Sequence, residues 1–571
     1  MSSIDLIVLF GTLGFIVIYG ALKTRGSKNI EGYLLGDNSM KWGTIGLSVM
    51  ATQASAITFL STPGQAYEDG LRFVQNYFGL PIALIIISAV FIPIYYKLKV
   101  YTAYEYLESR FDLKTRMLGA FLFLLQRGLA AGITIYAPAI ILSTIIGWDL
   151  SFTILLVGIL VIVYTVSGGT KAVSLTQKYQ MAIIMLGMFI AFFLIISYFP
   201  EQVSFMNSIK IAGKLGKLNA IDFSIDFSER YTFWSGITGG LILAMSYFGT
   251  DQSQVQRYLA GKSITESRMG LMFNAVLKVP MQFFILFVGV MVFVFYQFIQ
   301  PPLYFKQVVL EDKIINTAEY QSLQEKHDHN FADKKEALLD LSKAYNTNDQ
   351  IAVEKLTERA VALNEESKSL KNEVKDLITS IDPEAETKDS DYVFITFIMN
   401  YLPKGIIGLL IAVIFSAAMS STASELNALA STTVIDFYKR LLRPKGSDQH
   451  YLIVSKIMTA TWGLIAILFA FIARQSENLI EAVNIVGSVF YGTILGIFIV
   501  AFFIKSIRGT SIFIGALIAE IFVIGLHILT TFEVVEIGYL WYNAIGCALT
   551  ILMSWIIDKF SVKPTGSEFP G

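Results

Sequence analysis

Long apolar stretches, separated by short polar segments, recur along most of the 571-residue chain. A helix that crosses a membrane needs ~20 predominantly apolar residues. Thirteen stretches meet this requirement, at 4–22, 43–65, 73–97, 117–145, 150–167, 178–199, 232–256, 270–299, 391–420, 451–473, 478–504, 509–531 and 536–557. The pattern therefore predicts an all-α membrane protein with about 13 transmembrane helices.

Two of the expected spans are interrupted by polar residues at membrane depth. The first interruption covers residues 51–58 and the second covers residues 246–252. Unwound backbone in the hydrocarbon region survives only where protein buries it or where it lines a cavity. Broken helices at matching places in two halves of a chain are typical of the substrate site of a secondary transporter.

Residues 301–390 are polar, highly charged and favour helix. The pairs Val353/Leu356 and Val374/Leu377 belong to a seven-residue register, which is typical of a short coiled coil. Residues 346–349 have the composition of a turn. We expect an antiparallel helical hairpin on the external side of the membrane, with a partner that the sequence does not identify.

Composition supports a membrane protein. Hydrophobic residues make up 54% and charged residues 16% of the chain, against roughly 45–50% and about 25% in soluble proteins. The net charge of −1 gives no indication of nucleic-acid binding. Cys547 is the one cysteine, which excludes a disulfide within the chain. His327 and His329 lack further candidate ligands nearby, so two solvated histidines are expected there and not a metal site.

Basic residues indicate the orientation in the membrane. They concentrate in one set of alternate loops, for example at Lys97, Lys99, Arg110 and Lys114. Loops rich in lysine and arginine remain in the cytoplasm. We therefore expect a multi-pass protein of the plasma (inner) membrane with its N-terminus outside and its C-terminus in the cytoplasm.

The first interruption offers oxygen ligands and polar contacts. Gln53, Ser55 and Thr58 supply side-chain oxygens, and unwinding near 51–54 would free main-chain carbonyls. Carbonyl oxygens are hard ligands that suit Na⁺. The alternative is a helix–helix interface made of small residues.

A second group of hydroxyls lies within residues 415–424, where Ser420 and Ser421 are adjacent. These hydroxyls, together with carbonyls from the unwound helix, would complete a five-oxygen site for an alkali cation. The alternative is small-residue packing in which each serine bonds the carbonyl four residues before it.

Ionisable residues inside spans are costly and indicate function by default. Arg127, Lys278, Asp251 and Glu520 lie at such depths. Arg127 and Lys278 would attract an anionic or polyhydroxy solute. Alternatively, they form structural ion pairs, with Asp251 or Glu520 as partners.

Several motifs closely resemble the sodium/solute symporters, the family that includes the sodium–glucose cotransporters. The resemblance covers nearly the whole chain except 301–390. The matching segments are 51–59, 101–111, 164–169, 254–258, 417–424 and 436–439. Residues 135–139 are especially similar to the branch that carries monocarboxylates, iodide and vitamins.

The resemblance implies a LeuT-like fold with two inverted five-helix repeats. The implied parts of the chain are an N-terminal extra helix and loop (1–42), the first repeat (43–200), a linker with the start of the second repeat (201–300), the hairpin insertion (301–390), the remainder of the second repeat (391–505) and C-terminal extra helices with a tail (506–571).

The resemblance also implies a sodium site. It consists of the carbonyl oxygens of Ala51, Ala54 and Ala417 and the hydroxyls of Ser420 and Ser421.

The solute would lie between the broken helices. Tyr247 matches an aromatic gate and Lys278 a substrate-contacting lysine. The implied or candidate solute contacts are Gln53, Ser55, Thr58, Gln75, Asn76, Tyr77, Arg127, Tyr247 and Lys278.

The chain departs from the family pattern in two places. Gln177 and Lys178 stand where members usually carry an aspartate near the sodium exit path, which puts the kinetics of Na⁺ release in doubt. Ala244 replaces a polar sugar contact, which argues against a simple sugar pose.

These features predict a sodium-coupled symporter, and not an enzyme, that imports a small organic solute by alternating access. An organic anion such as a monocarboxylate or a sugar acid is favoured over a neutral sugar. The alternative is a transporter of the same fold coupled to protons or another cation. A channel would need a continuous polar pore, and a transport-like sensor would need an attached signalling domain.

Overall fold

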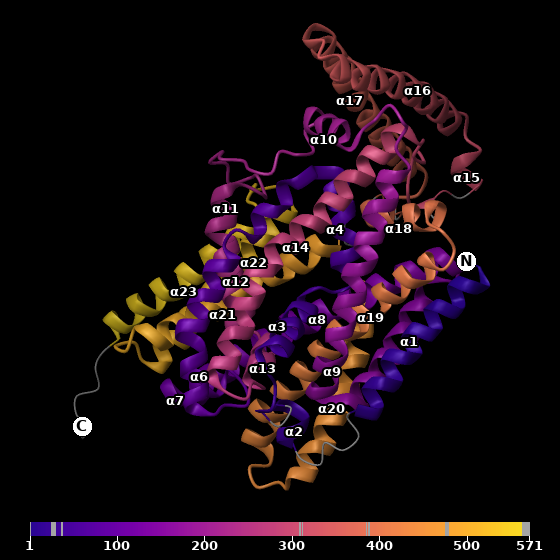
Figure 1. Cartoon of the computed structure of the whole chain (residues 1–571). Coiled ribbons are helices and arrows are strands. Elements are labelled where there is room, and N and C mark those ends of the chain that lie inside the picture. The colour runs from indigo at the N-terminus through magenta and orange to yellow at the C-terminus, as the bar shows by residue number, and fades with distance from the viewer. Residues whose placement is uncertain are drawn as a thin grey trace.

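The apolar stretches of the sequence are helices in a computed structural model of the chain (Figure 1). The structure describes residues 2–23, 30–35, 38–307, 310, 312–383, 385, 387, 389–473 and 479–561. Within these ranges the regular structure is helical, apart from an isolated bridge between Met40 and Gly261. The expected all-α class is therefore confirmed.

The first half of the chain forms helices up to the linker near residue 200. They are α1 (Ser3–Lys23), α2 (Ile30–Leu35), α3 (Trp42–Gln53), α4 (Ala56–Asp69), the 3-10 helix η2 (Gly70–Tyr77), α5 (Leu80–Ile86), the π-helix η3 (Ile87–Phe91), α6 (Ile92–Leu98), α7 (Glu105–Arg110), α8 (Leu113–Ile146) and α9 (Leu150–Ser197).

The second half contains the insertion and the remaining apolar helices. They are α10 (Phe205–Lys214), α11 (Phe233–Ile237), α12 (Gly239–Gly249), α13 (Gln252–Leu259), α14 (Ile264–Phe298), α15 (Asp312–Ile315), α16 (Ala318–Thr347), α17 (Gln350–Ile381), α18 (Ser390–Tyr401), α19 (Ile406–Thr432), the π-helix η5 (Thr433–Leu442), α20 (Asp448–Ala473), α21 (Leu479–Phe503), α22 (Gly509–Thr531) and α23 (Leu540–Phe560).

Membrane-crossing helices make up most of this architecture. Among the described residues, nine helical segments are long and apolar enough to cross a membrane, and Ser3–Phe15 and Leu150–Val163 are shorter apolar helices. The protein is therefore a multi-pass membrane protein, whereas the total of thirteen spans stays a prediction.

The two spans expected at 150–167 and 178–199 lie on one helix, α9, which is 48 residues long. A helix of this length is about 72 Å long, more than twice the ~30 Å hydrocarbon thickness. The segment between the two expected spans contains glycines but no proline. Glycine costs only about 1 kcal/mol in a helix interior, whereas proline removes a hydrogen bond, so the helix continues through the expected loop.

The span expected at 391–420 is divided between two helices, and the second of them continues beyond residue 420. The structure has a 12-residue helix, α18, which ends at Tyr401, and a second helix, α19, which runs from Ile406 to Thr432. Pro403 disfavours helical backbone at the residue before it, and Gly405 has a φ of +89°. The hydroxyl-rich segment consequently lies in the middle of a helix and not at its end.

Both predicted helix interruptions are present. The first lies between α3 and α4, where Ala54 has φ −86° and ψ 72°. The second lies between α12 and α13, where Thr250 has φ −128° and the Asp251 carboxylate accepts a 2.8 Å bond from the Ser253 N–H. α3 and α4 pack against α14 and α19, and α12 packs against α5 and α21. The two breaks are therefore buried in protein, as the bilayer requires.

The insertion forms the predicted antiparallel hairpin of α16 and α17, which projects from one end of the molecule (Figure 1). Asn348 adopts a left-handed conformation with φ +55° at the turn, and Asp349 caps α17 through the Ala352 N–H. The hairpin also contacts the body of the protein. Lys371 forms ion pairs with Glu68 at 2.5 Å and with Asp389 at 2.9 Å.

The start of α1 lies on the side of the molecule that carries the hairpin, and α23 lies on the opposite side (Figure 1). Asp5 in α1 accepts bonds from the N–H groups of Gly405 and Gly408, at the start of α19. Arg508, which directly precedes α22, forms an ion pair of 3.0 Å with Asp558 in the last turn of α23. Residues 562–571 of the expected C-terminal tail lie outside the described residues.

Candidate functional site

A cavity of about 110 Å³ lies between the two broken helices. Its walls come from α3, α4, α8, α12, α19 and α21, so segments from both halves of the chain enclose it. Asn76 and Tyr77 of η2 complete the lining. This is the arrangement expected of a solute site between discontinuous helices.

Most of the candidate solute contacts line this cavity. They are Gln53, Ser55, Thr58, Asn76, Tyr77, Arg127 and Tyr247. Ala244 also lines it, so an apolar surface is present where the family resemblance led us to expect a polar sugar contact. The candidates that line the cavity therefore come from four separate parts of the sequence.

Gln75 and Lys278 are not among the lining residues. The Gln75 amide nitrogen donates to the Tyr231 carbonyl at 2.7 Å, and its amide oxygen accepts from the Asp222 N–H at 2.9 Å. It joins η2 to the segment before α11. Lys278 is 1% exposed on α14, which packs against α3 and α4. A direct solute contact of either residue stays a prediction.

The expected sodium ligands meet at the first break. The Ser421 hydroxyl lies 3.4 Å from the Ala51 carbonyl oxygen, which brings α19 against the last turn of α3. Ala54 and Ala417 are buried beside them. The Ser420 hydroxyl is buried and has no hydrogen-bond partner among the described residues. An unpaired buried hydroxyl is costly, and a bound cation would accept its lone pair.

Gln177 replaces the family's acid with an amide that links three helices. Its amide nitrogen donates to the Thr52 hydroxyl at 3.1 Å and to the Ser424 hydroxyl at 3.2 Å. Its amide oxygen accepts from the Ser48 hydroxyl at 2.5 Å. α3, α9 and α19 are thus connected beside the candidate sodium site by neutral groups.

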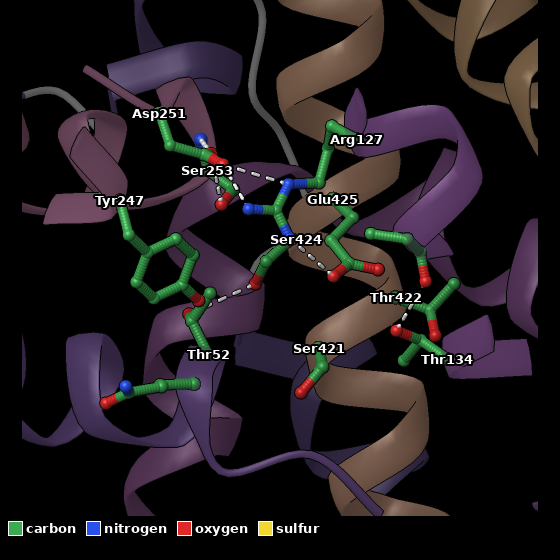
Figure 2. A network of polar contacts seen from close by, with 12 residues as sticks. Thr52, Arg127, Thr134, Tyr247, Asp251, Ser253, Ser421, Thr422, Ser424 and Glu425 are labelled. Carbon is green, nitrogen blue, oxygen red and sulfur yellow. Dashed lines mark hydrogen bonds and ion pairs between the residues drawn. The ribbon is translucent and has the colours of Figure 1, made fainter. Parts of the chain in front are cut away.

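Arg127 is the centre of a buried ion-pair cluster (Figure 2). Its guanidinium contacts the Asp251 carboxylate through two nitrogens, one of them at 3.0 Å, and it also donates to the Tyr491 hydroxyl. A third nitrogen donates to Glu425 at 3.1 Å. One cation therefore faces two carboxylates. The structural ion pair considered as an alternative for Arg127 is present, and Glu520 is not part of this cluster.

Glu425 is a site residue that the sequence analysis missed. It follows Ser424 on α19 and lines the cavity, and its second carboxylate oxygen has no hydrogen-bond partner among the described residues. Gln126, Asn484 and Tyr491 also line the cavity. The sequence does place an acid directly after the hydroxyl-rich segment. Glu425 was missed because the expected span ended at residue 420 and left it outside the membrane.

Tyr247 lines the cavity beside the Arg127 cluster. The centre of its ring is 5.3 Å from the Arg127 guanidinium carbon, within the range of a cation–π interaction. Its hydroxyl accepts a 2.6 Å bond from the Gln254 amide. Both contacts hold the ring at the second break, where it forms part of the cavity wall.

The first break also creates opposite partial charges. α3 ends at Gln53 and directs the negative end of its dipole toward the Ser420–Ser421 side. α4 begins at Ala56, and its N-cap residue Ser55 makes no side-chain capping bond. Ser55, Ile57 and Thr58 line the cavity at this positive helix end. One break can thus stabilise a cation at α3 and an anionic group at α4.

Comparison with known proteins agrees with this geometry. The chain is 34% identical to sodium-coupled monocarboxylate transporter 1 of Xenopus laevis, over 46% of this chain and 42% of the relative. It is 31% identical to the human sodium/iodide cotransporter, over 49% and 43%. The chain thus spans less than half the length of these two relatives. It is 26% identical to the sodium-dependent multivitamin transporter of Oryctolagus cuniculus, over 90% and 69%.

A solved structure shares the fold. The substrate-bound, outward-open state of a Na⁺-coupled sialic acid symporter superposes with a TM-score of 0.74 at 23% identity, over 98% of both chains. The sodium:solute symporter family matches residues 33–316 and 381–522, which leaves out most of the hairpin. On this match, the chain belongs to the sodium:solute symporter family, whose members are transporters and not enzymes.

Proposed function

We propose that this protein imports a small organic anion together with Na⁺. The observation that carries the proposal is the first break, where Ser421 meets the Ala51 carbonyl on one side and the uncapped start of α4 faces the cavity on the other. Na⁺ binding at the end of α3 would hold α19 against the broken helix. A solute could then enter the cavity beside it.

The start of α4 supports an anionic solute better than the basic residues do. Arg127 is offset by Asp251 and Glu425, so the cluster has a formal charge of −1. Lys278 does not line the cavity. The free N–H groups of α4 and the hydroxyls of Ser55 and Thr58 can bind a carboxylate. Polar groups elsewhere in the cavity, such as Asn76 and Gln126, suit a solute that also carries hydroxyls.

Coupling follows from the shared break. A cation at α3 and an anion at α4 attract one another, so each raises the affinity for the other by the same factor. A favourable membrane potential adds ~2.3 kcal/mol per net charge per 100 mV. We place the N-terminus and the hairpin outside and the C-terminus in the cytoplasm of a plasma membrane, because the loops rich in lysine and arginine would then face the cytoplasm.

Proton coupling is the second candidate, because Glu425 offers an unpaired carboxylate oxygen within the cavity. Proteoliposome uptake distinguishes the two functions. Monocarboxylates and sugar acids should accumulate above the external concentration under a Na⁺ gradient and not under a proton gradient of equal size. Accumulation that needs only the proton gradient would favour Glu425 as the coupling group. Equilibration without accumulation would indicate a channel.

Competition tests the solute class separately. Organic anions should inhibit uptake, and neutral sugars of similar size should not. Inhibition by neutral sugars alone would contradict the anion proposal and leave the symporter assignment unchanged.

A further inference from the structure

A second cavity, of about 80 Å³, lies between the hairpin and the body of the protein. Its walls come from α4, the segment that contains Lys217, the end of α14, and α16 and α17 of the hairpin. Neither the symport proposal nor the family match accounts for it, because most of the hairpin lies outside the matched residues.

Two buried lysines line this cavity. Lys217 is 6% exposed, and its ammonium lies 2.5 Å from the Glu68 carbonyl oxygen and 4.5 Å from the centre of the Phe293 ring. Lys334 is also 6% exposed and donates a 2.8 Å bond to the Ser367 hydroxyl. Among the described residues, neither ammonium lies within 4.0 Å of a carboxylate oxygen.

A buried hydroxyl of α14 lines the same cavity. Tyr296 is 1% exposed, and its hydroxyl has no hydrogen-bond partner among the described residues. A buried donor without an acceptor costs about 1–3 kcal/mol. The cavity thus contains two cations that lack a paired carboxylate and one hydroxyl that lacks an acceptor.

We propose that this cavity binds one small monovalent anion, held by Lys217, Lys334 and the Tyr296 hydroxyl. An anion attracts both buried ammonium groups and supplies the acceptor for the hydroxyl. The side chains of Phe293 and Phe305 in the wall add no competing hydrogen-bond acceptor, which suits a weakly hydrated ion.

The segment around Lys217 is fixed by the body of the protein. The Leu71 N–H donates a 2.9 Å bond to the Lys217 carbonyl oxygen, and Gly70 has a φ of +68°. A Cβ atom at Gly70 would lie 2.4 Å from that oxygen. Lys217 therefore belongs to the body and Lys334 belongs to the hairpin, so a bound anion would join the two.

The protonation of the lysines sets the pH dependence. Burial lowers the pKa of Lys217 to about 8, and burial together with the charge of Lys217 lowers the pKa of Lys334 to about 8. Both ammonium groups keep their charge below that pH and lose it above. The other titratable groups around the cavity are Glu68, Tyr67, His327, Lys368 and Lys371. Burial lowers the pKa of His327, so it adds no charge near neutrality.

Equilibrium binding of radiolabelled chloride to the purified full chain tests the proposal, with Na⁺ held constant and gluconate as the balancing anion. We expect one chloride per chain at pH 7 and at least tenfold weaker binding at pH 9.5. Lys334→Met and Lys217→Met should each weaken binding at least tenfold. Lys326→Met, on an exposed position of the same helix as Lys334, is the matched control and should bind as wild type.

Tyr296→Phe keeps the test independent of folding, because it removes only the hydroxyl and should weaken chloride binding at least threefold. The absence of saturable binding to the wild-type protein would overturn the proposal. So would wild-type affinity in folded Lys217→Met, Lys334→Met and Tyr296→Phe variants, which would place the ion elsewhere.

Discussion

The Gln177 amide nitrogen and the Ser424 hydroxyl are 3.2 Å apart, one helical turn from Ser420. A neutral amide therefore occupies the position beside the candidate sodium site at which family members usually carry a negative charge. The bond network around it is complete, because the amide oxygen is paired with Ser48. Na⁺ at this site would therefore have a neutral side chain beside it at position 177.

Gln177→Glu tests this difference with a side chain of the same length. The added charge should raise the apparent Na⁺ affinity about threefold to tenfold, and tenfold corresponds to about 1.4 kcal/mol. Sodium titration of solute uptake in proteoliposomes measures the change. An unaltered sodium dependence in the folded variant would show that residue 177 does not sense the ion.

Replacing both Ser420 and Ser421 with alanine removes two candidate ligands. The apparent Na⁺ affinity should fall at least tenfold, about 1.4 kcal/mol, because the cation would keep only carbonyl oxygens. The matched control is Thr422→Val, since the Thr422 hydroxyl bonds the Ala418 carbonyl of its own helix at 2.9 Å. Equal losses in the control and the double variant would argue for packing and against ligation.

Arg127→Gln should strongly reduce the folded yield. It leaves Asp251 and Glu425 buried without their cation, and breaking a buried ion pair typically costs about 3–5 kcal/mol. The triple variant Arg127→Met, Asp251→Asn, Glu425→Gln removes all three charges and should recover most of the lost thermal stability. Fluorescence-detected gel filtration after heating follows both variants. If Arg127→Gln were as stable as wild type while losing only solute affinity, Arg127 would be a solute ligand and not a brace.

Tyr247→Ala should lower the accumulation ratio more than it lowers the amount of folded protein. The ring forms the cavity wall beside the Arg127 cluster, and its loss opens a path for solute toward the second break. Tyr247→Phe is the control, because it keeps the ring and loses only the Gln254 bond. Uptake normalised to folded protein separates the two effects, and wild-type accumulation in Tyr247→Ala would contradict a gating role.

Lys371→Met should loosen the hairpin from the body. The change removes a cation that pairs with Glu68 and with Asp389, whose side chain is 2% exposed. Lys368→Met is the matched control one turn earlier, because Lys368 pairs with an exposed glutamate of its own helix. Proteolysis of the hairpin should quicken at least threefold in Lys371→Met only. Equal rates would show that the ion pairs do not hold the hairpin.

Sequence patterns located the elements that depend on local chemistry. The runs of Gln, Ser and Thr at 51–58 have no place on a lipid-facing helix, so the break there followed from composition alone. The turn at Asn348 followed from its polar neighbours in the same way. These features depend on residues that are adjacent in the chain.

Features that depend on contacts between distant residues were harder to predict. The span expected at 391–420 merged α18 with the first half of α19, and this shift excluded Glu425 from the membrane. Arg127 consequently had no visible partner on α19. The role of Gln75 was also not predicted, because the two hydrogen bonds of its side-chain amide reach residues about 150 positions away in the sequence.

The attachment of the hairpin to α4 has a mechanical consequence. α16 contains 30 residues, which corresponds to a rod about 45 Å long. If the outer half of the broken helix tilts by about 10° and the hairpin follows it, the tip near Asn348 would move by about 8 Å, from the arc of such a rod. The displacement of the hairpin tip would then be larger than that of the tilting helix itself. A fluorophore pair with one dye at the tip would report each opening of the transporter optically, at a distance from the solute.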